Sequence, residues 1–262
     1  MRFSGVTERN PNVEDWSRKY RNLPNSRFFQ DALKALGASL ENDHRLIVFG
    51  FIGQRDIPGV TLRHAQSVLR WDQRPSLWSH VFLIPRALPL PARTKNVPLR
   101  EVVLFPRSGV FPKPEANGVI DGGLPVYDER KLDANVALVA VRVSPREARV
   151  VRDRALNPNV ERLRYDLWGS LGRWHRYLWS DGSDMNPLRV GTPMFCASFI
   201  EMCFAAIELD ITPAASEQNS APEHLWSAAL WWHEAFEAFG HPVSGRYVLR
   251  DKGCALLGTE EH

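Results

Sequence analysis

Two uninterrupted apolar runs constrain the fold of this chain more than any other feature. Residues 45–52, RLIVFGFI, are rich in β-branched and aromatic side chains, and residues 135–143, NVALVAVRV, have no polar residue in their middle. Such runs are typical of buried strands, because a strand with one face in water alternates apolar and polar residues. We therefore expect both runs to be strands, the second in a central position covered on both faces.

Weaker patterns predict the other elements. Strand composition recurs at 77–84, 99–105 and 245–250, and Pro85 is expected to end the first of these, followed by a proline-rich insertion up to Pro98. Apolar residues at helical spacing predict helices over 25–37, 61–71, 159–179, 196–207 and 223–239, the second of them capped by Thr61. The stretch 109–123, rich in Gly, Pro and Asn, is expected to form turns.

Composition narrows the class of protein. A chain of 262 residues with 44% hydrophobic content can bury a full core, and its net charge of +3 gives no support to nucleic-acid binding. The three cysteines are too few for a disulfide framework, and no pair has the spacing of zinc ligands, so we expect neither a metal nor another cofactor. Without a signal peptide or an apolar run of ~18 residues, a cytoplasmic location without a membrane span is expected, although specialised export would leave no such mark.

Cys196 stands where a nucleophile would gain most from a helix. It opens the helical pattern of residues 196–207, and Pro193 lies just upstream as a start signal. The free N–H groups and the positive end of a helix dipole favour a thiolate over a thiol. The alternative is a core cysteine, since cysteine is among the most often buried residue types.

A cysteine becomes a candidate nucleophile only with a histidine and an orienting polar residue. His80 lies at the start of a buried strand pattern, where a rigidly held ring suits a general base, and Glu101 lies at the start of the next one. Glu101 could accept from the His80 ring and hold its tautomer, and a different strand register would bring Glu115 or Asp121 there instead. The alternatives are a core histidine and a solvated glutamate at a strand edge.

Three short segments resemble one known family. They are Ser79-His-Val-Phe-Leu-Ile, Glu101-Val-Val-Leu and Phe195-Cys-Ala-Ser-Phe-Ile. Their residue types and their order in the chain resemble the circularly permuted branch of the NlpC-type, papain-like cysteine peptidases. This branch includes the YiiX-like and lecithin:retinol acyltransferase-like groups, and in it the histidine precedes the cysteine. The chain departs from the pattern in Ala197-Ser198, where such families often have Ser followed by an acidic residue.

The resemblance implies a fold and a site. The fold is α+β, with an antiparallel sheet packed against the helix that bears the nucleophile: an N-terminal arm and helix (1–44), a permuted papain-like core (45–213), and a C-terminal helix and tail (214–262). The candidate catalytic residues are Cys196 as nucleophile, His80 as base and Glu101 as orienting group. An acyl-enzyme mechanism follows, with the backbone N–H of Cys196 contributing to the oxyanion site.

The sequence is compatible with three functional hypotheses. The first is a thiol hydrolase that cleaves an amide, isopeptide or thioester bond of a peptide or acyl-bearing substrate. The second is an acyltransferase that uses the same Cys/His pair. The third is an inactive papain-like binding module, in which Cys196 and His80 would be too far apart to interact.

Overall fold

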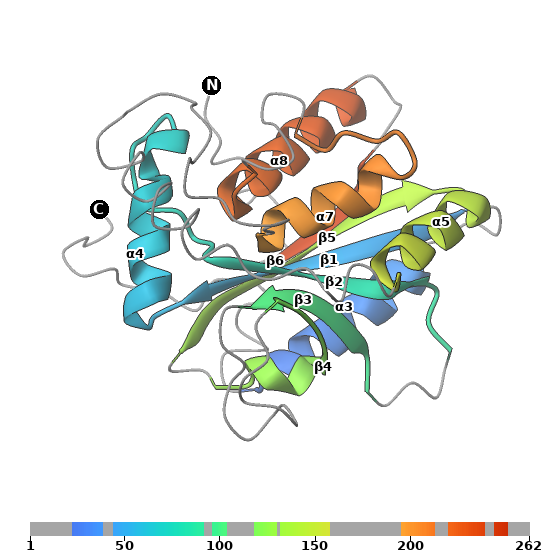
Figure 1. Ribbon diagram of the computed structural model, residues 1–262, viewed down its shortest axis with the longest axis horizontal. Coiled ribbons are helices and arrows are strands. Elements are labelled where there is room, and N and C mark those ends of the chain that lie inside the picture. Colours follow the sequence, from blue (N-terminus) through green and yellow to red (C-terminus); the bar gives the residue numbers. More distant parts are fainter. Residues whose placement is uncertain are drawn as a thin grey trace.

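The two apolar runs pair with each other inside an antiparallel sheet. The computed structural model describes residues 23–38, 44–91, 96–103, 118–129, 132–157, 195–212, 220–238 and 244–250. In chain order the described strands are β1 (Arg45–Gln54), β2 (His80–Leu88), β3 (Pro98–Val103), β4 (Gly118–Gly123), β5 (Asp133–Val143) and β6 (Ser244–Arg250). They lie side by side in the order β4-β3-β2-β1-β5-β6, every pair antiparallel, and Figure 1 shows the sheet in its setting.

Helices cover both faces of this sheet. Their bounds are α3 (Asn25–Ala38), α4 (Ile57–Ala65), α5 (Pro145–Ala155), α7 (Cys196–Ala205) and α8 (Pro222–Ala238), with the 3₁₀ turns η1 (Gln66–Leu69) and η2 (Leu124–Tyr127). Figure 1 shows α7 and α8 on one side of the sheet and α3 on the other. The protein is therefore α+β, as the sequence predicts, and the central strands are covered on both faces.

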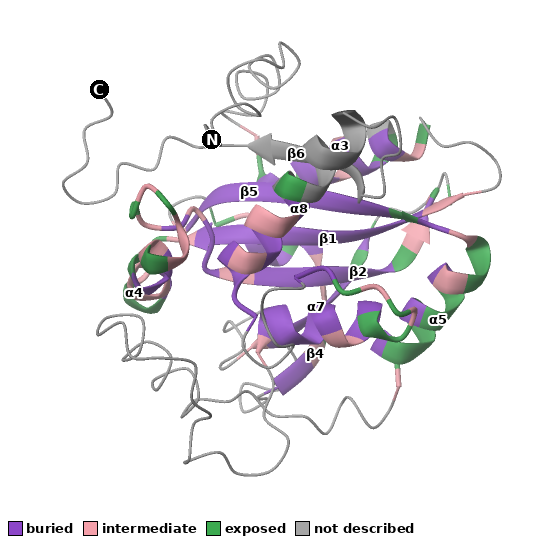
Figure 2. Ribbon diagram, turned by 90° about the horizontal axis from the view of Figure 1, so that it is seen from above, coloured by how far each residue is buried: buried purple, intermediate pink, exposed green. Residues whose placement is uncertain are grey.

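Side chains of β1 point alternately to the two faces of the sheet and join two different core clusters. In β1, Phe49 and Phe51 belong to the core cluster shared with α7 and α8, whereas Val48 and Ile52 belong to the cluster under α3. All four side chains are fully buried, and Figure 2 shows β1, β2 and β5 buried along most of their length. Because both faces lie against apolar side chains, polar alternation is absent from β1 and from most of β5.

Three element predictions are wrong in detail. The second helix begins at Ile57, not at Thr61, because Asp56 caps it by accepting a hydrogen bond of 2.9 Å from the Gly59 N–H. Strand β2 runs through Pro85 to Leu88. A register shift between β1 and β2 accommodates the proline, which lacks an N–H group to donate. Residues 118–123, expected in turns, form β4 and pair with β3.

The remaining predictions of helices and strands are either confirmed or lie outside the described residues. The helices at 25–37, 196–207 and 223–239 and the strands at 45–52, 99–105, 135–143 and 245–250 are confirmed within a few residues at each end. The helix predicted over 159–179 lies outside the described residues, as does Glu115.

Gly50 leaves room for aromatic side chains on the face of the sheet that packs against α3. It faces Phe82 across the β1–β2 ladder, and a Cβ added to Gly50 would lie 2.1 Å from the tip of the Phe82 ring. That ring in turn contacts Phe29 of α3 edge-on and stacks on Tyr127 of η2. A larger residue at position 50 would therefore push Phe82 into its aromatic neighbours.

We predict that Gly50→Ala lowers the free energy of unfolding by about 2 kcal/mol or more, because overpacking forces the Phe82 ring to move. Urea denaturation measures the change. The control is Gly37→Ala in α3, where an added Cβ meets atoms no closer than 3.7 Å. There alanine should leave stability equal or raise it by roughly 0.5–1 kcal/mol. Equal stabilities of the two variants would contradict the packing described for Phe82.

Candidate active site

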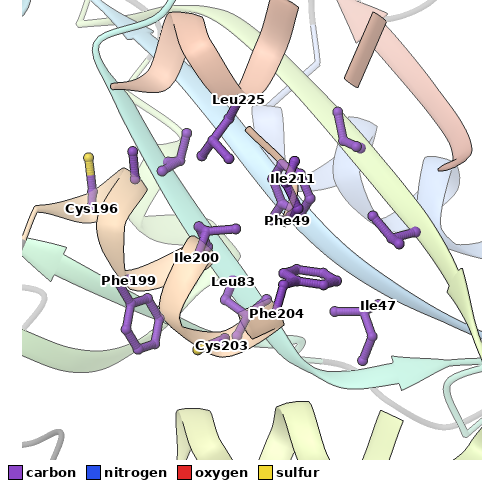
Figure 3. Packing of buried hydrophobic residues seen from close by; sticks show 14 of the residues in the cluster. Ile47, Phe49, Leu83, Cys196, Phe199, Ile200, Cys203, Phe204, Ile211 and Leu225 are labelled. Atoms are coloured by element: carbon purple, nitrogen blue, oxygen red, sulfur yellow. The ribbon is translucent and has the colours of Figure 1, made fainter. Parts of the chain in front are cut away.

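Cys196 is the first residue of α7, as its position in the helical pattern predicts. The N-cap residue, Phe195, is extended and offers no side-chain oxygen to the first-turn N–H groups. The backbone N–H groups of Val81 and Ala197 donate to the Cys196 sulfur instead. Figure 3 shows this sulfur projecting from the start of α7, while Ile200, further along the helix, points into the core. The helix therefore places the sulfur among N–H donors that favour a thiolate.

His80 and Glu101 lie beside each other on neighbouring strands. Phe82 faces Glu101 across the β2–β3 ladder, and His80, two residues before Phe82, shares its face of the strand. The Nε2 atom of His80 is 2.6 Å from Oε2 of Glu101, and the two side chains are only 11% and 3% exposed. The structure thus brings together the histidine and the carboxylate that the sequence singled out, each on a rigid strand.

The thiol and the imidazole shift each other's pKa in opposite directions. Burial lowers the pKa of His80, but hydrogen bonds to Cys196 and Glu101 and the charges of both outweigh burial and raise that pKa to about 10. Burial raises the pKa of Cys196, but the hydrogen bond and charge of His80, with backbone donors, bring it below its ordinary value of 9.0. Because Nε2 of His80 faces Glu101, Nδ1 is the ring nitrogen left for the thiol. These opposite shifts are what a thiolate–imidazolium pair requires.

Tyr127 is a neighbour of this site that the sequence analysis did not single out. It ends the 3₁₀ turn η2, and its hydroxyl donates a hydrogen bond to the same Oε2 of Glu101 that contacts His80. Tyr127 is 2% exposed. No motif surrounds Tyr127 in the sequence. Only the path of the chain from β4 to β5 brings it back to Glu101.

Of the two other carboxylates considered for the imidazole, only Asp121 is described. Its side chain is 67% exposed and accepts hydrogen bonds of 2.8 and 2.9 Å from a guanidinium nitrogen of Arg100. In the ladder Asp121 faces Arg100, one position from Glu101. This one-residue offset puts Asp121 and Glu101 on opposite faces of the sheet, so Glu101 is the carboxylate beside His80.

A buried polar network holds the chain segment that leads into His80. The side-chain amide of Gln66 donates to the Trp78 carbonyl at 2.9 Å, and the Trp78 N–H donates to the Ser76 hydroxyl at 2.9 Å. Ser76 donates to Glu223 of α8 at 2.6 Å, and Arg70 binds the other carboxylate oxygen at 3.2 Å. Burial raises the pKa of Glu223, and Arg70 opposes that shift. The network fixes the backbone just before β2 begins and ties it to α8.

Cys203 provides an internal comparison on the same helix. It is fully buried, and burial raises the pKa of its thiol to about 12, although Arg154 and Arg100 oppose the shift. In Figure 3, Cys203 lies near the far end of α7 from Cys196. A thiol that stays protonated reacts slowly, so the two cysteines of α7 should differ strongly in reactivity.

We predict that Cys196→Ala lowers the pKa of His80 below about 10, because only Glu101 would then oppose the lowering effect of burial. NMR titration of the histidine ring resonances measures this pKa, and the spectrum of His80→Gln identifies the signal. The control is Cys203→Ala, which should leave the His80 titration unchanged. If the titration midpoint stayed the same in Cys196→Ala, the two side chains would not interact.

Among the described residues, no group of three or more His, Cys, Asp or Glu side chains could hold a metal ion, and no helix has the length and apolar character needed to cross a membrane. No family model, no curated protein and no solved structure matches this chain.

Proposed function

We propose that this protein is a thiol hydrolase of the papain-like, permuted NlpC type, which cleaves an amide, isopeptide or thioester bond through an acyl-enzyme on Cys196. The observation that carries the proposal is the interaction between Cys196 and His80, with opposite pKa shifts and with Glu101 behind the imidazole. A cysteine nucleophile needs these three parts.

The arrangement of elements supports the papain-like part of the proposal. The candidate base and its carboxylate stand on adjacent antiparallel strands, and the candidate nucleophile heads a helix packed on β2 and β3. The histidine strand precedes the cysteine helix in the chain, which is the order of the permuted branch. In this proposal Cys196, His80 and Glu101 take the roles of the nucleophile, the base and the orienting group of that family.

In the first half of the proposed reaction, the Cys196 thiolate attacks the substrate carbonyl carbon and forms a tetrahedral intermediate. The backbone N–H of Cys196, at the first position of α7, has no intrahelical acceptor and is assigned to the oxyanion. The His80 imidazolium gives its proton to the leaving nitrogen or sulfur as that bond breaks. A thioester between Cys196 and the acyl group remains, and His80 is neutral.

In the second half, neutral His80 takes a proton from water as the water oxygen attacks the thioester carbonyl. The Cys196 sulfur then leaves as a thiolate, the acid product departs, and the thiolate–imidazolium pair is restored. Glu101 stabilises the imidazolium in both halves because its Oε2 remains at hydrogen-bond distance from Nε2. The protons balance over the cycle without a cofactor.

Acyl transfer by the same pair is the second candidate. Cys196 is only 6% exposed, and a thioester at a site with little exposure to water survives longer to meet another acceptor. The binding-module hypothesis is less well supported, because it requires that Cys196 and His80 be too far apart to interact, whereas each shifts the pKa of the other.

We predict that Cys196→Ala lowers turnover on the order of 10³-fold or more, because it removes the only atom that forms the covalent intermediate. A panel of amide, isopeptide and thioester substrates is assayed, with intact-mass detection of an acyl adduct on the wild type. Circular dichroism should show an unchanged fold.

Cys203→Ala is the matched control and should keep turnover within a few-fold of wild type. Full turnover by Cys196→Ala would rule out the mechanism. Adding hydroxylamine or an amine separates the two candidates, since a transferase diverts most of the acyl group to the acceptor whereas a hydrolase releases mainly acid.

A further inference from the structure

Tyr127 and His80 contact the same oxygen of a buried carboxylate. The Tyr127 hydroxyl donates to Oε2 of Glu101, and the Nε2 atom of His80 lies 2.6 Å from that same oxygen. Glu101 is 2% exposed, so water contributes little to its solvation. Each of the two donors therefore carries a large share of the stabilisation of the Glu101 charge.

The Tyr127 hydroxyl is held in place from several directions. Its ring stacks on Phe82, with centroids 5.1 Å apart and planes at 22°. The Asn25 side chain, at the start of α3, donates to the Tyr127 carbonyl at 2.7 Å. The backbone N–H and the hydroxyl of Ser26 donate to the side chain of Asp128, the residue after Tyr127, at 2.7 and 2.8 Å. A donor fixed in this way keeps its bond to Glu101 whichever protonation state His80 adopts.

The shared oxygen links the Tyr127 hydroxyl to the proton affinity of His80. When the His80 ring is charged, it satisfies the Glu101 carboxylate strongly, and the bond from Tyr127 adds less. When the ring is neutral, the carboxylate depends more on Tyr127. The hydroxyl thus stabilises the state with neutral His80 more than the state with charged His80.

We infer that Tyr127 is a positioning residue of the candidate site, which acts through Glu101 to make the His80 imidazolium a stronger acid than Glu101 alone would allow. The inference rests on the proposed function, in which His80 must give up its proton to the leaving group. Among the described residues, the charged groups that shift the pKa of His80 are Cys196 of α7 and Glu101 of β3. The hydroxyl of Tyr127 in η2 contacts Glu101, and the Tyr127 ring centroid lies 6.3 Å from that of His80.

The test is an NMR titration of the His80 ring in the full chain, with Tyr127→Phe compared with wild type. Phenylalanine keeps the ring that stacks on Phe82 and removes only the hydroxyl. We expect the His80 midpoint to rise by roughly 0.5–1 pH unit, given the strength of hydrogen bonds to charged groups. In the Glu101→Gln background, the same substitution should cause no shift.

Two further variants separate this role from a merely structural one. Ser26→Ala removes one bond that anchors η2 and leaves the hydroxyl of Tyr127 in place, so it should leave the midpoint of His80 unchanged. Should Tyr127→Phe fail to fold, Tyr127→Met removes the same hydroxyl with a flexible apolar side chain and is expected to give the same upward shift.

An unchanged or lowered midpoint in Tyr127→Phe would overturn the inference, as would an equal shift in Ser26→Ala or a shift that persists in Glu101→Gln. Failure of the proposed function would be detected by a different measurement, the alkylation rate of Cys196. In that case Cys196 would show no dependence on His80 in its alkylation rate, whatever the titration of His80 in the Tyr127 variants.

Discussion

The interaction between Cys196 and His80 is the one on which the rest of the site depends. Each group alone would be expected to stay neutral, because burial raises the pKa of the thiol and lowers that of the imidazole. Together they shift in opposite directions, and a buried ion pair is stable only when further hydrogen bonds satisfy both charges. Glu101 supplies that support on the imidazole side, and the N–H groups of Val81 and Ala197 supply it on the sulfur side.

The fold provides these contacts from elements that are far apart in the sequence. The sheet brings β2 and β3 together, and α7 lies across both of them. Two flanking helices act at a distance: α3 anchors η2, which carries Tyr127, and α8 supplies Glu223 to the network around Ser76 just before His80. Helices at both ends of the chain therefore hold the site in place without contributing a reacting atom.

Much of the fold follows from local patterns. The apolar runs of β1 and β5 predict strands because both faces of each strand are buried, and the helical spacing of its apolar residues predicts α7. The start of α4 does not follow from apolar spacing, because Asp56 caps a first turn that contains Pro58 and Gly59, whereas the apolar residues at helical spacing begin at Leu62. The glycines of residues 118–123 predict turns, whereas pairing with β3 determines the conformation of this segment. The site residues also differ in how far local patterns predict them. Cys196, His80 and Glu101 lie at or near the starts of predicted helices and strands, whereas Tyr127 reaches Glu101 only through the tertiary path of the chain.

The proposed thiolate–imidazolium pair is tested most directly by the rates at which limiting iodoacetamide alkylates Cys196 and Cys203 across pH, measured by peptide mapping in wild type and in His80→Ala. Cys196 should react faster than Cys203 at mildly acidic to neutral pH, because the pKa of Cys196 is lowered and that of Cys203 is raised to about 12. In His80→Ala, Cys196 should lose that advantage as its thiol pKa rises. Equal, slow alkylation of the two cysteines in wild type would show that Cys196 is a core cysteine and would contradict the proposed mechanism.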